Sequence, residues 1–140
     1  MAEKTIASEF DGYWRDKDKG SIPSKSGVYC VYECTYNSEK DSVSIHRLIY
    51  IGEADDVKDR IAKHGKRDKW LKHVRRENEL CFSLGGVGST DRSRAEAALI
   101  FKHKPPENDE YVDSFPFDKT TVSLSGKTAL LTTRFTVDRT

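Results

Sequence analysis

The chain of 140 residues is long enough for one domain with its own hydrophobic core and too short for two ordinary ones. Charged residues make up 34% and hydrophobic residues 36% of the sequence, which is typical of a small globular protein with a polar surface. The sequence has no apolar run near the roughly 18 residues of a membrane span, and its first residues lack the apolar region of a signal peptide. We therefore expect no membrane partner and a cytoplasmic location.

The three cysteines, Cys30, Cys34 and Cys81, are an odd number and form no CxxC motif or zinc-type Cys/His cluster. This pattern favours free, buried thiols in a reducing cytoplasm over disulfides or a metal centre.

In chain order, residues 1–25 are predicted to form an N-terminal helical extension, because Phe10, Tyr13 and Trp14 are spaced as on one helix face. Alternating apolar residues predict strands over 28–36 and 43–51, which form an antiparallel hairpin, with Gly52 ending the second strand. Helices are predicted over about 55–64 and 68–77, followed by a strand over 79–84.

The next predicted helix, over about 93–101, has Glu96 on its apolar face, where an unpaired carboxylate costs several kcal/mol (roughly 2–7 on transfer scales). Glu96 therefore needs a cation as partner, either a side chain or a metal ion. Pro105 and Pro106 end this helix. The last alternating segments predict a C-terminal hairpin over 118–138, so residues 1–140 are expected to form one domain.

The residues Tyr50-Ile51-Gly52 end a strand and precede a helix whose apolar positions are Val57 and Ile61. Arg60 and His64 share the inward stripe of that helix. Such side chains either extend outward over the apolar surface or point into a cleft.

Together with Gly27-Val28-Tyr29 on the preceding strand, this segment resembles the signature of the GIY-YIG nuclease family. The resemblance covers about residues 26–110 and continues through Arg60, Glu96 and Asn108. It implies an α+β fold in which a small antiparallel β-sheet is flanked by helices, to which this chain adds the C-terminal hairpin. The spacing of Arg60 and His64 resembles the restriction-endonuclease-like branch of the family.

The resemblance also implies roles for the two motif tyrosines. Tyr29 would lie near the attacking water as its general base or its positioner. A tyrosine with the reference pKa of about 10 is a poor base at neutral pH, so it needs either a metal ion that lowers its pKa or a group that accepts its proton, for which His64 is the natural candidate. Tyr50 would hold the phosphate or order the water in the cleft.

The other matched residues would bind the phosphate and a metal ion. Arg60 would donate to the scissile phosphate with two N–H groups. Glu96 would hold one divalent cation, Mg²⁺ or Mn²⁺, whose remaining ligands are waters and phosphate oxygens. Asn108 would fix a loop or contact a phosphate.

Glu53 is a departure from the family pattern, because many members have a lysine directly after the second motif. Three interpretations stay open: His64 compensates for the missing cation, Glu53 joins the metal site, or the domain is catalytically weak.

A basic segment over residues 58–76 contains nine Lys and Arg against two Asp, on a chain with a net charge of only +1. Such a segment is typical either of a surface that follows phosphates or of a solvated helix face. Beside the nuclease-like motif, the first interpretation predicts DNA contacts at Lys58, Lys63, Lys66, Arg67, Lys69, Lys72, Arg75 and Arg76.

The sequence therefore predicts a divalent-metal-dependent DNA endonuclease that hydrolyses phosphodiester bonds. Double-strand cleavage would need a homodimer or two sequential nicks. No recognition module is apparent in the sequence, so we expect a nuclease that is structure-selective, weakly specific, or one part of a larger system with further protein subunits. The alternatives are a catalytically weak or inactive DNA-binding or interaction domain on the same fold, and an enzyme that acts on small nucleotides.

Overall fold

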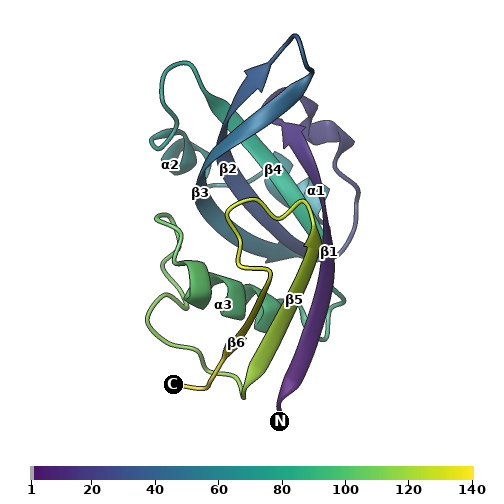
Figure 1. Cartoon of the computed structure of the whole chain (residues 1–140), viewed down its shortest axis with the longest axis vertical. Helices are drawn as coiled ribbons and strands as arrows, with labels where there is room; N and C mark the ends of the chain where they lie inside the picture. Colours follow the sequence, from purple (N-terminus) through teal and green to yellow (C-terminus); the bar gives the residue numbers. More distant parts are fainter. Residues whose placement is uncertain (1) are drawn as a thin grey trace.

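The computed structural model describes residues 2–140 and contains one curved β-sheet with helices on both faces (Figure 1). The strands are β1 (Lys4–Arg15), β2 (Gly27–Asn37), β3 (Ser42–Ala54), β4 (Glu79–Gly86), β5 (Thr120–Gly126) and β6 (Arg134–Val137). The helices are the 3₁₀ helix η1 (Asp16–Ser21) and the α-helices α1 (Val57–Ala62), α2 (Arg67–Leu71) and α3 (Arg92–His103).

The six strands are ordered β3-β2-β4-β1-β5-β6, so β3 and β6 form the two edges. The predicted α+β class is confirmed, and β3, β2 and β4 pair antiparallel as expected. The predicted C-terminal hairpin is confirmed as the antiparallel pair β5 and β6. The whole sheet is mixed, however, because β1 and β5 run parallel to each other.

The predicted N-terminal helical extension is wrong, because most of it is strand β1 in the interior of the sheet. β1 lies between β4 and β5, and its Ile6, Ser8 and Phe10 alternate with exposed residues. A register shift between Gly12 and Trp14 interrupts the pairing with β4. The helix-like spacing of Phe10, Tyr13 and Trp14 arises from this irregularity in a strand.

Two hydrophobic clusters fill the two faces of the sheet. The first contains Val28, Cys30 and Tyr32 of β2 and the buried residues of α3, together with apolar residues of β5 and β6. The second contains Tyr29 and Val31 of β2 with Trp70 and the apolar residues of α1. Figure 1 shows α3 on one face of the sheet and α1 and α2 on the other. Neighbouring residues of β2 thus point into different cores.

Several element boundaries differ from those predicted, including both ends of α1 and α3, and for two elements the contacts give the reason. α2 ends at Leu71, whereas the basic helix was expected to reach residue 77, because the turn before β4 is held by hydrogen bonds to Glu33 instead. β3 continues through Gly52 to Ala54, since residues 52–54 still pair with β2.

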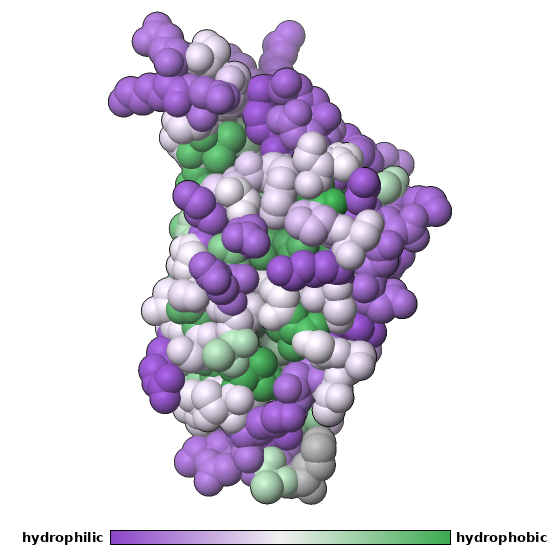
Figure 2. Space-filling view, turned by 90° about the vertical axis from the view of Figure 1, so that its right-hand side faces the viewer, coloured by the Kyte–Doolittle hydropathy of each residue, from purple (hydrophilic) through white to green (hydrophobic). Residues whose placement is uncertain are grey.

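The surface is polar, and Figure 2 shows only separate small apolar patches on the side where β1 lies in Figure 1. Cys30, Cys34 and Cys81 are free and buried, as predicted. Within residues 2–140, no helix is both long enough and apolar enough to cross a membrane.

Candidate active site at the edge of strand β3

The register between β2 and β3 places both motif tyrosines on one face of the sheet. Tyr29 pairs with Gly52, and Val31 pairs with Tyr50. Because paired residues of antiparallel strands project to the same side, the two tyrosine rings are neighbours, with their centroids 6.3 Å apart. The Tyr29 ring is fully buried.

Helix α1 directs His64 toward these tyrosines. The helix begins after Asp56, whose side chain accepts a hydrogen bond from the Asp59 N–H, as is typical of an N-cap. Val57 and Ile61 bury one face of α1 in the second cluster. The His64 ring, just beyond the helix, is buried with its centroid 6.2 Å from that of Tyr29 and 5.4 Å from that of Tyr50.

Arg60 belongs to an exposed turn of α1, yet its charge acts on the buried Tyr29 hydroxyl. Burial raises the pKa of Tyr29 far above its ordinary value, and the nearby Tyr50 and Glu96 raise it further, whereas Arg60 lowers it. Tyr29 therefore stays protonated at neutral pH, so its hydroxyl keeps a proton to donate.

The hydrogen bond at His64 assigns a donor role to its second ring nitrogen. His64 Nδ1 accepts a hydrogen bond from the Lys66 N–H at 3.0 Å, so the neutral ring carries its proton on Nε2. Burial, followed by Arg60 and Lys66, lowers the pKa of His64 to about 4. This arrangement differs from the expectation that His64 accepts a proton from Tyr29, because no lone pair of the neutral ring is free for it.

Trp70 is a member of this cluster that the sequence placed only on the apolar side of a basic helix. Its ring centroid lies 4.4 Å from that of His64 and 5.4 Å from that of Tyr50. Among the described residues, Tyr29 Oη, His64 Nε2 and Trp70 Nε1 are buried polar atoms that make no hydrogen bond of good geometry. Buried polar groups without partners are costly, so this aromatic cluster carries three such groups at an energetic cost to the fold.

Glu96 of α3 lies near the same tyrosines and lines a pocket of about 300 Å³ with Tyr50, Lys66 and Asn108. Within residues 2–140 no ion pair joins Glu96 to Arg60, so the partner that its burial demands is not that arginine. Burial, followed by the charges of Glu53 and Glu110, raises the pKa of Glu96 to about 7. The site therefore attracts a cation or a proton to this carboxylate.

Glu53 forms an ion pair with Arg92, with 2.5 Å between Arg92 Nε and Glu53 Oε1. Arg92 also donates to Ser26 Oγ at 2.9 Å, which fixes the guanidinium in place. Of the three interpretations of Glu53, its joining the metal site is thus disfavoured. Across the described part of the chain, no group of three or more His, Cys, Asp or Glu side chains is arranged to hold a metal ion.

Asn108 fixes the segment after α3 to the edge of the sheet. Its Oδ1 accepts from the Ile51 N–H at 3.0 Å, and its Nδ2 donates to the Ile51 carbonyl at 2.9 Å. The side chain thereby imitates a neighbouring strand, which agrees with a loop-fixing role for Asn108.

The basic residues predicted to contact DNA differ in how freely they can do so. Arg67 forms two hydrogen bonds with Asp16, at 2.6 and 2.7 Å, so its guanidinium is committed within the protein. Ion pairs join Lys63 to Asp59, Lys66 to Asp109 and Arg75 to Glu33. The exposed side chains of Lys58, Lys69, Lys72 and Arg76 make no ion pair with any other described residue.

Comparison with known proteins gives one informative similarity. The chain is 30% identical over 91 residues to UvrABC system protein C of Haloarcula marismortui. The match covers 64% of this chain and 14% of that protein, so the chain spans only a small part of its relative's length. No family model matches the sequence, and no solved structure matches it. The similarity is consistent with the resemblance to GIY-YIG nucleases.

Proposed function

We propose that this chain is a divalent-metal-dependent DNA endonuclease that hydrolyses phosphodiester bonds. The observation that carries the proposal is the convergence of Tyr29, Tyr50, His64 and Glu96, which come from four separate segments, at the edge of β3. The similarity to UvrABC system protein C supports a role on DNA.

Glu96 is the residue that would hold the metal ion, Mg²⁺ or Mn²⁺. Glu96 is half-buried, and burial together with the charges of Glu53 and Glu110 raises the pKa of its carboxyl group, so a divalent cation is a favourable partner. A single carboxylate suffices for Mg²⁺ when waters and substrate phosphate oxygens complete the shell. When bound, such an ion activates water and stabilises the leaving oxyanion.

The residues of the chain position the substrate and the attacking water around that centre. Tyr29, held protonated, offers a hydrogen-bond donor to the attacking water, and His64 Nε2–H offers a second donor from the same buried cluster. Arg60, exposed at the rim, contributes positive charge to the scissile phosphate. Asn108 acts as a positioning residue, because both of its hydrogen bonds go to Ile51.

One observation favours the alternative of a catalytically weak DNA-binding domain. The position after the second motif holds Glu53 paired with Arg92, so no lysine there lowers the pKa of Tyr29. A domain of this kind would bind DNA without cutting it.

The discriminating experiment is nicking of supercoiled plasmid with Mg²⁺ or Mn²⁺, run beside EDTA. Glu96→Gln and Tyr29→Phe are the test variants, and Glu110→Gln, an exposed residue of the same pocket, is the matched control. We expect metal-dependent nicking that falls at least about 100-fold in the two test variants, as for removal of one transition-state contact, and far less in the control. A retarded DNA band without cleavage in any lane would support the binding domain instead.

The number of active centres determines how the protein would cut both strands of a DNA duplex. One centre cuts one strand at a time, so cleavage of both strands requires a homodimer or two sequential nicks. Further protein subunits would supply sequence specificity.

A further inference from the structure

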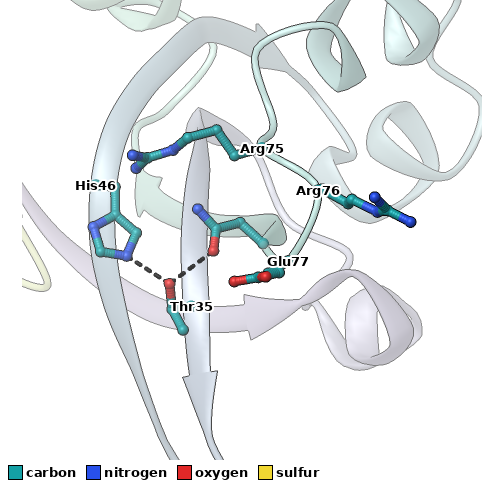
Figure 3. Close-up of a pocket in the computed structure, with 6 residues that line it drawn as sticks. Thr35, His46, Arg75, Arg76 and Glu77 are labelled. Atoms are coloured by element: carbon teal, nitrogen blue, oxygen red, sulfur yellow. Dashed lines mark hydrogen bonds between the residues drawn. The ribbon is translucent and has the colours of Figure 1, made fainter.

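A group of basic side chains lies along β3 beyond the candidate active site, toward the β2–β3 turn. It consists of His46 and Arg47 of β3 with Arg75 and Arg76 of the turn before β4, and we call it the β3 basic tract. These side chains line a hollow of about 370 Å³, except Arg47, and Figure 3 shows Arg75 extending toward His46 while Arg76 points away from it. Its other lining residues are Thr35, Glu77 and Asn78.

The turn that carries Arg75 and Arg76 is anchored by Glu33, a carboxylate of β2 that is only 1% exposed. Glu33 Oε2 accepts hydrogen bonds from the Arg75 N–H at 2.9 Å, from Arg75 Nε at 3.1 Å and from Asn78 Nδ2 at 2.7 Å. Burial alone would raise the pKa of Glu33, but these bonds outweigh it and lower the value to about 2. A buried charge held this way needs its partners in place, so Glu33 ties the turn to β2.

The anchoring leaves the Arg75 guanidinium outside the core. The Arg75 side chain is 69% exposed, and in Figure 3 it extends toward His46. His46 is held in turn by Thr35, with 2.6 Å between His46 Nε2 and Thr35 Oγ1, and Thr35 donates to Asn78 Oδ1. Hydrogen bonds therefore hold Thr35, His46 and Asn78 in place at the hollow.

The remaining arginines of the tract, Arg47 and Arg76, form no ion pair with a carboxylate of the described residues 2–140. Arg47 Nη1 lies 3.4 Å from His73 Nδ1, a ring nitrogen of another basic side chain. Arg76 makes no ion pair with any other described residue. Both are exposed. An exposed guanidinium without an acidic partner suits the bidentate recognition of phosphate.

The tract continues directly from the candidate active site. His46 and Tyr50 are four residues apart on β3, which corresponds to roughly 13 Å at about 3.3 Å per residue. Between the two, Arg47 touches His73, and His73 Nε2 lies 2.7 Å from Glu107 Oε2, beside Asn108 of the active-site pocket. Basic side chains thus follow the edge of the sheet away from the pocket.

We propose that the β3 basic tract binds the phosphodiester backbone of the DNA, at a phosphate several nucleotides away from the one that is cut. The proposal rests on the proposed function and adds the path of the bound strand along β3. Because the contacts are to the backbone, they hold the DNA in register without reading its sequence.

The test is the affinity for a fluorescent DNA duplex in EDTA, where no cleavage takes place, measured as a function of salt concentration. Arg47→Ala and Arg76→Ala are made singly and together. Each lost phosphate contact is expected to reduce the slope of log K against log salt by about 1, and the double variant should bind about 10-fold more weakly or worse. The matched control is Arg134→Ala, an exposed arginine on β6 at the opposite edge of the sheet.

Two further measurements test whether the effect comes from the charge of the tract and from binding alone. Glu77→Gln removes the one acidic side chain lining the hollow and should tighten binding. With Mg²⁺ or Mn²⁺, the double variant should show a raised KM and an unchanged cleavage rate at saturating DNA, because the tract does not touch the reacting phosphate.

The outcomes separate this inference from the proposed function. If the double variant keeps the affinity and the salt slope of the wild type, the tract does not bind DNA, even if the wild-type protein cuts DNA. If the double variant binds DNA more weakly and the wild type does not cut DNA, the role of the tract in DNA binding is supported and the proposed nuclease activity is overturned. Absence of DNA binding by the wild type would overturn both.

Discussion

The ring of Tyr29 lies over Gly52, so close that a Cβ atom at position 52 would approach Tyr29 Oη and Cζ to 2.3 Å. The glycine of the second motif is therefore required by the tyrosine of the first. Gly52→Ala should displace the Tyr29 ring, with a loss of about 1–3 kcal/mol in the free energy of unfolding, as for other overpacked sites. Plasmid nicking should fall about 100-fold, because a misplacement of about 1 Å has that effect.

The control for this change is Gly88→Ala, where a Cβ would meet no atom within 4 Å. Urea unfolding and nicking assays should show almost no change in this variant. Equal stability and activity of Gly52→Ala and wild type would contradict the role of the Tyr29–Gly52 contact.

Two tyrosines on opposite faces of β2 should respond oppositely to loss of the hydroxyl. Tyr29→Phe removes a buried hydroxyl that has no good hydrogen bond, so the free energy of unfolding should stay equal or rise by about 1 kcal/mol, while nicking is lost. Tyr32→Phe removes the hydrogen bond to the Ala129 carbonyl and should cost about 1 kcal/mol, while nicking persists. Urea unfolding and plasmid nicking of both variants check this prediction, and loss of nicking in Tyr32→Phe would weaken it.

The pKa of Glu96 predicts a pH dependence of stability. Because its pKa is raised from 4.5 to about 7, the folded protein binds more protons here than the unfolded chain between these pH values. The stabilising contribution of the protonated form is thus complete below pH 4.5 and is lost as the pH rises through 7. Glu96→Gln should therefore gain stability relative to wild type as the pH is raised from 4.5 to above 7, as measured by urea unfolding.

The same carboxylate predicts how the protein binds metal. Mg²⁺ or Mn²⁺ competes with the proton on Glu96, so calorimetric titrations should show weaker binding below pH 7 than above it. A pH-independent affinity would show that Glu96 is not a ligand.

His64 should make the protein less stable in acid. Its pKa is lowered from 6.5 to about 4, so the unfolded chain binds more protons here between these values, and stability falls as the pH falls from 6.5 toward 4. His64→Gln should remove this slope from urea unfolding curves. His46→Gln, at an exposed position of β3, is the matched control, and equal slopes in the two variants would contradict the assignment.

Asn108→Ala should release the segment after α3 from the edge of β3. It removes both hydrogen bonds to Ile51 and should cost about 1–3 kcal/mol in the free energy of unfolding. Hydrogen exchange should show faster exchange of the Ile51 amide, which loses its acceptor. Asp109→Asn, the exposed neighbour, is the control and should leave that exchange unchanged.

Much of the fold was predictable from local patterns. The alternation in residues 28–36 and 43–51 predicted the central hairpin, and the C-terminal hairpin followed in the same way. Strand β1 was not predictable from such a pattern, because its last residues are irregular and its membership in the sheet depends on pairing with β4 and β5, which are far away in the sequence. Strand formation depends on partners more strongly than helix formation does.

The sequence by itself determined which residues could form the candidate site: two motif tyrosines, a histidine after a helix and a carboxylate on an apolar helix face. Their order and their spacing are local properties of the chain. Only the tertiary structure decided that Glu53 pairs with Arg92, that His64 is a donor at Nε2, and that Trp70 joins the aromatic cluster. The reason is physical, because hydrogen bonds, ion pairs and burial arise between residues that are brought together by folding, and no periodicity within one segment encodes them.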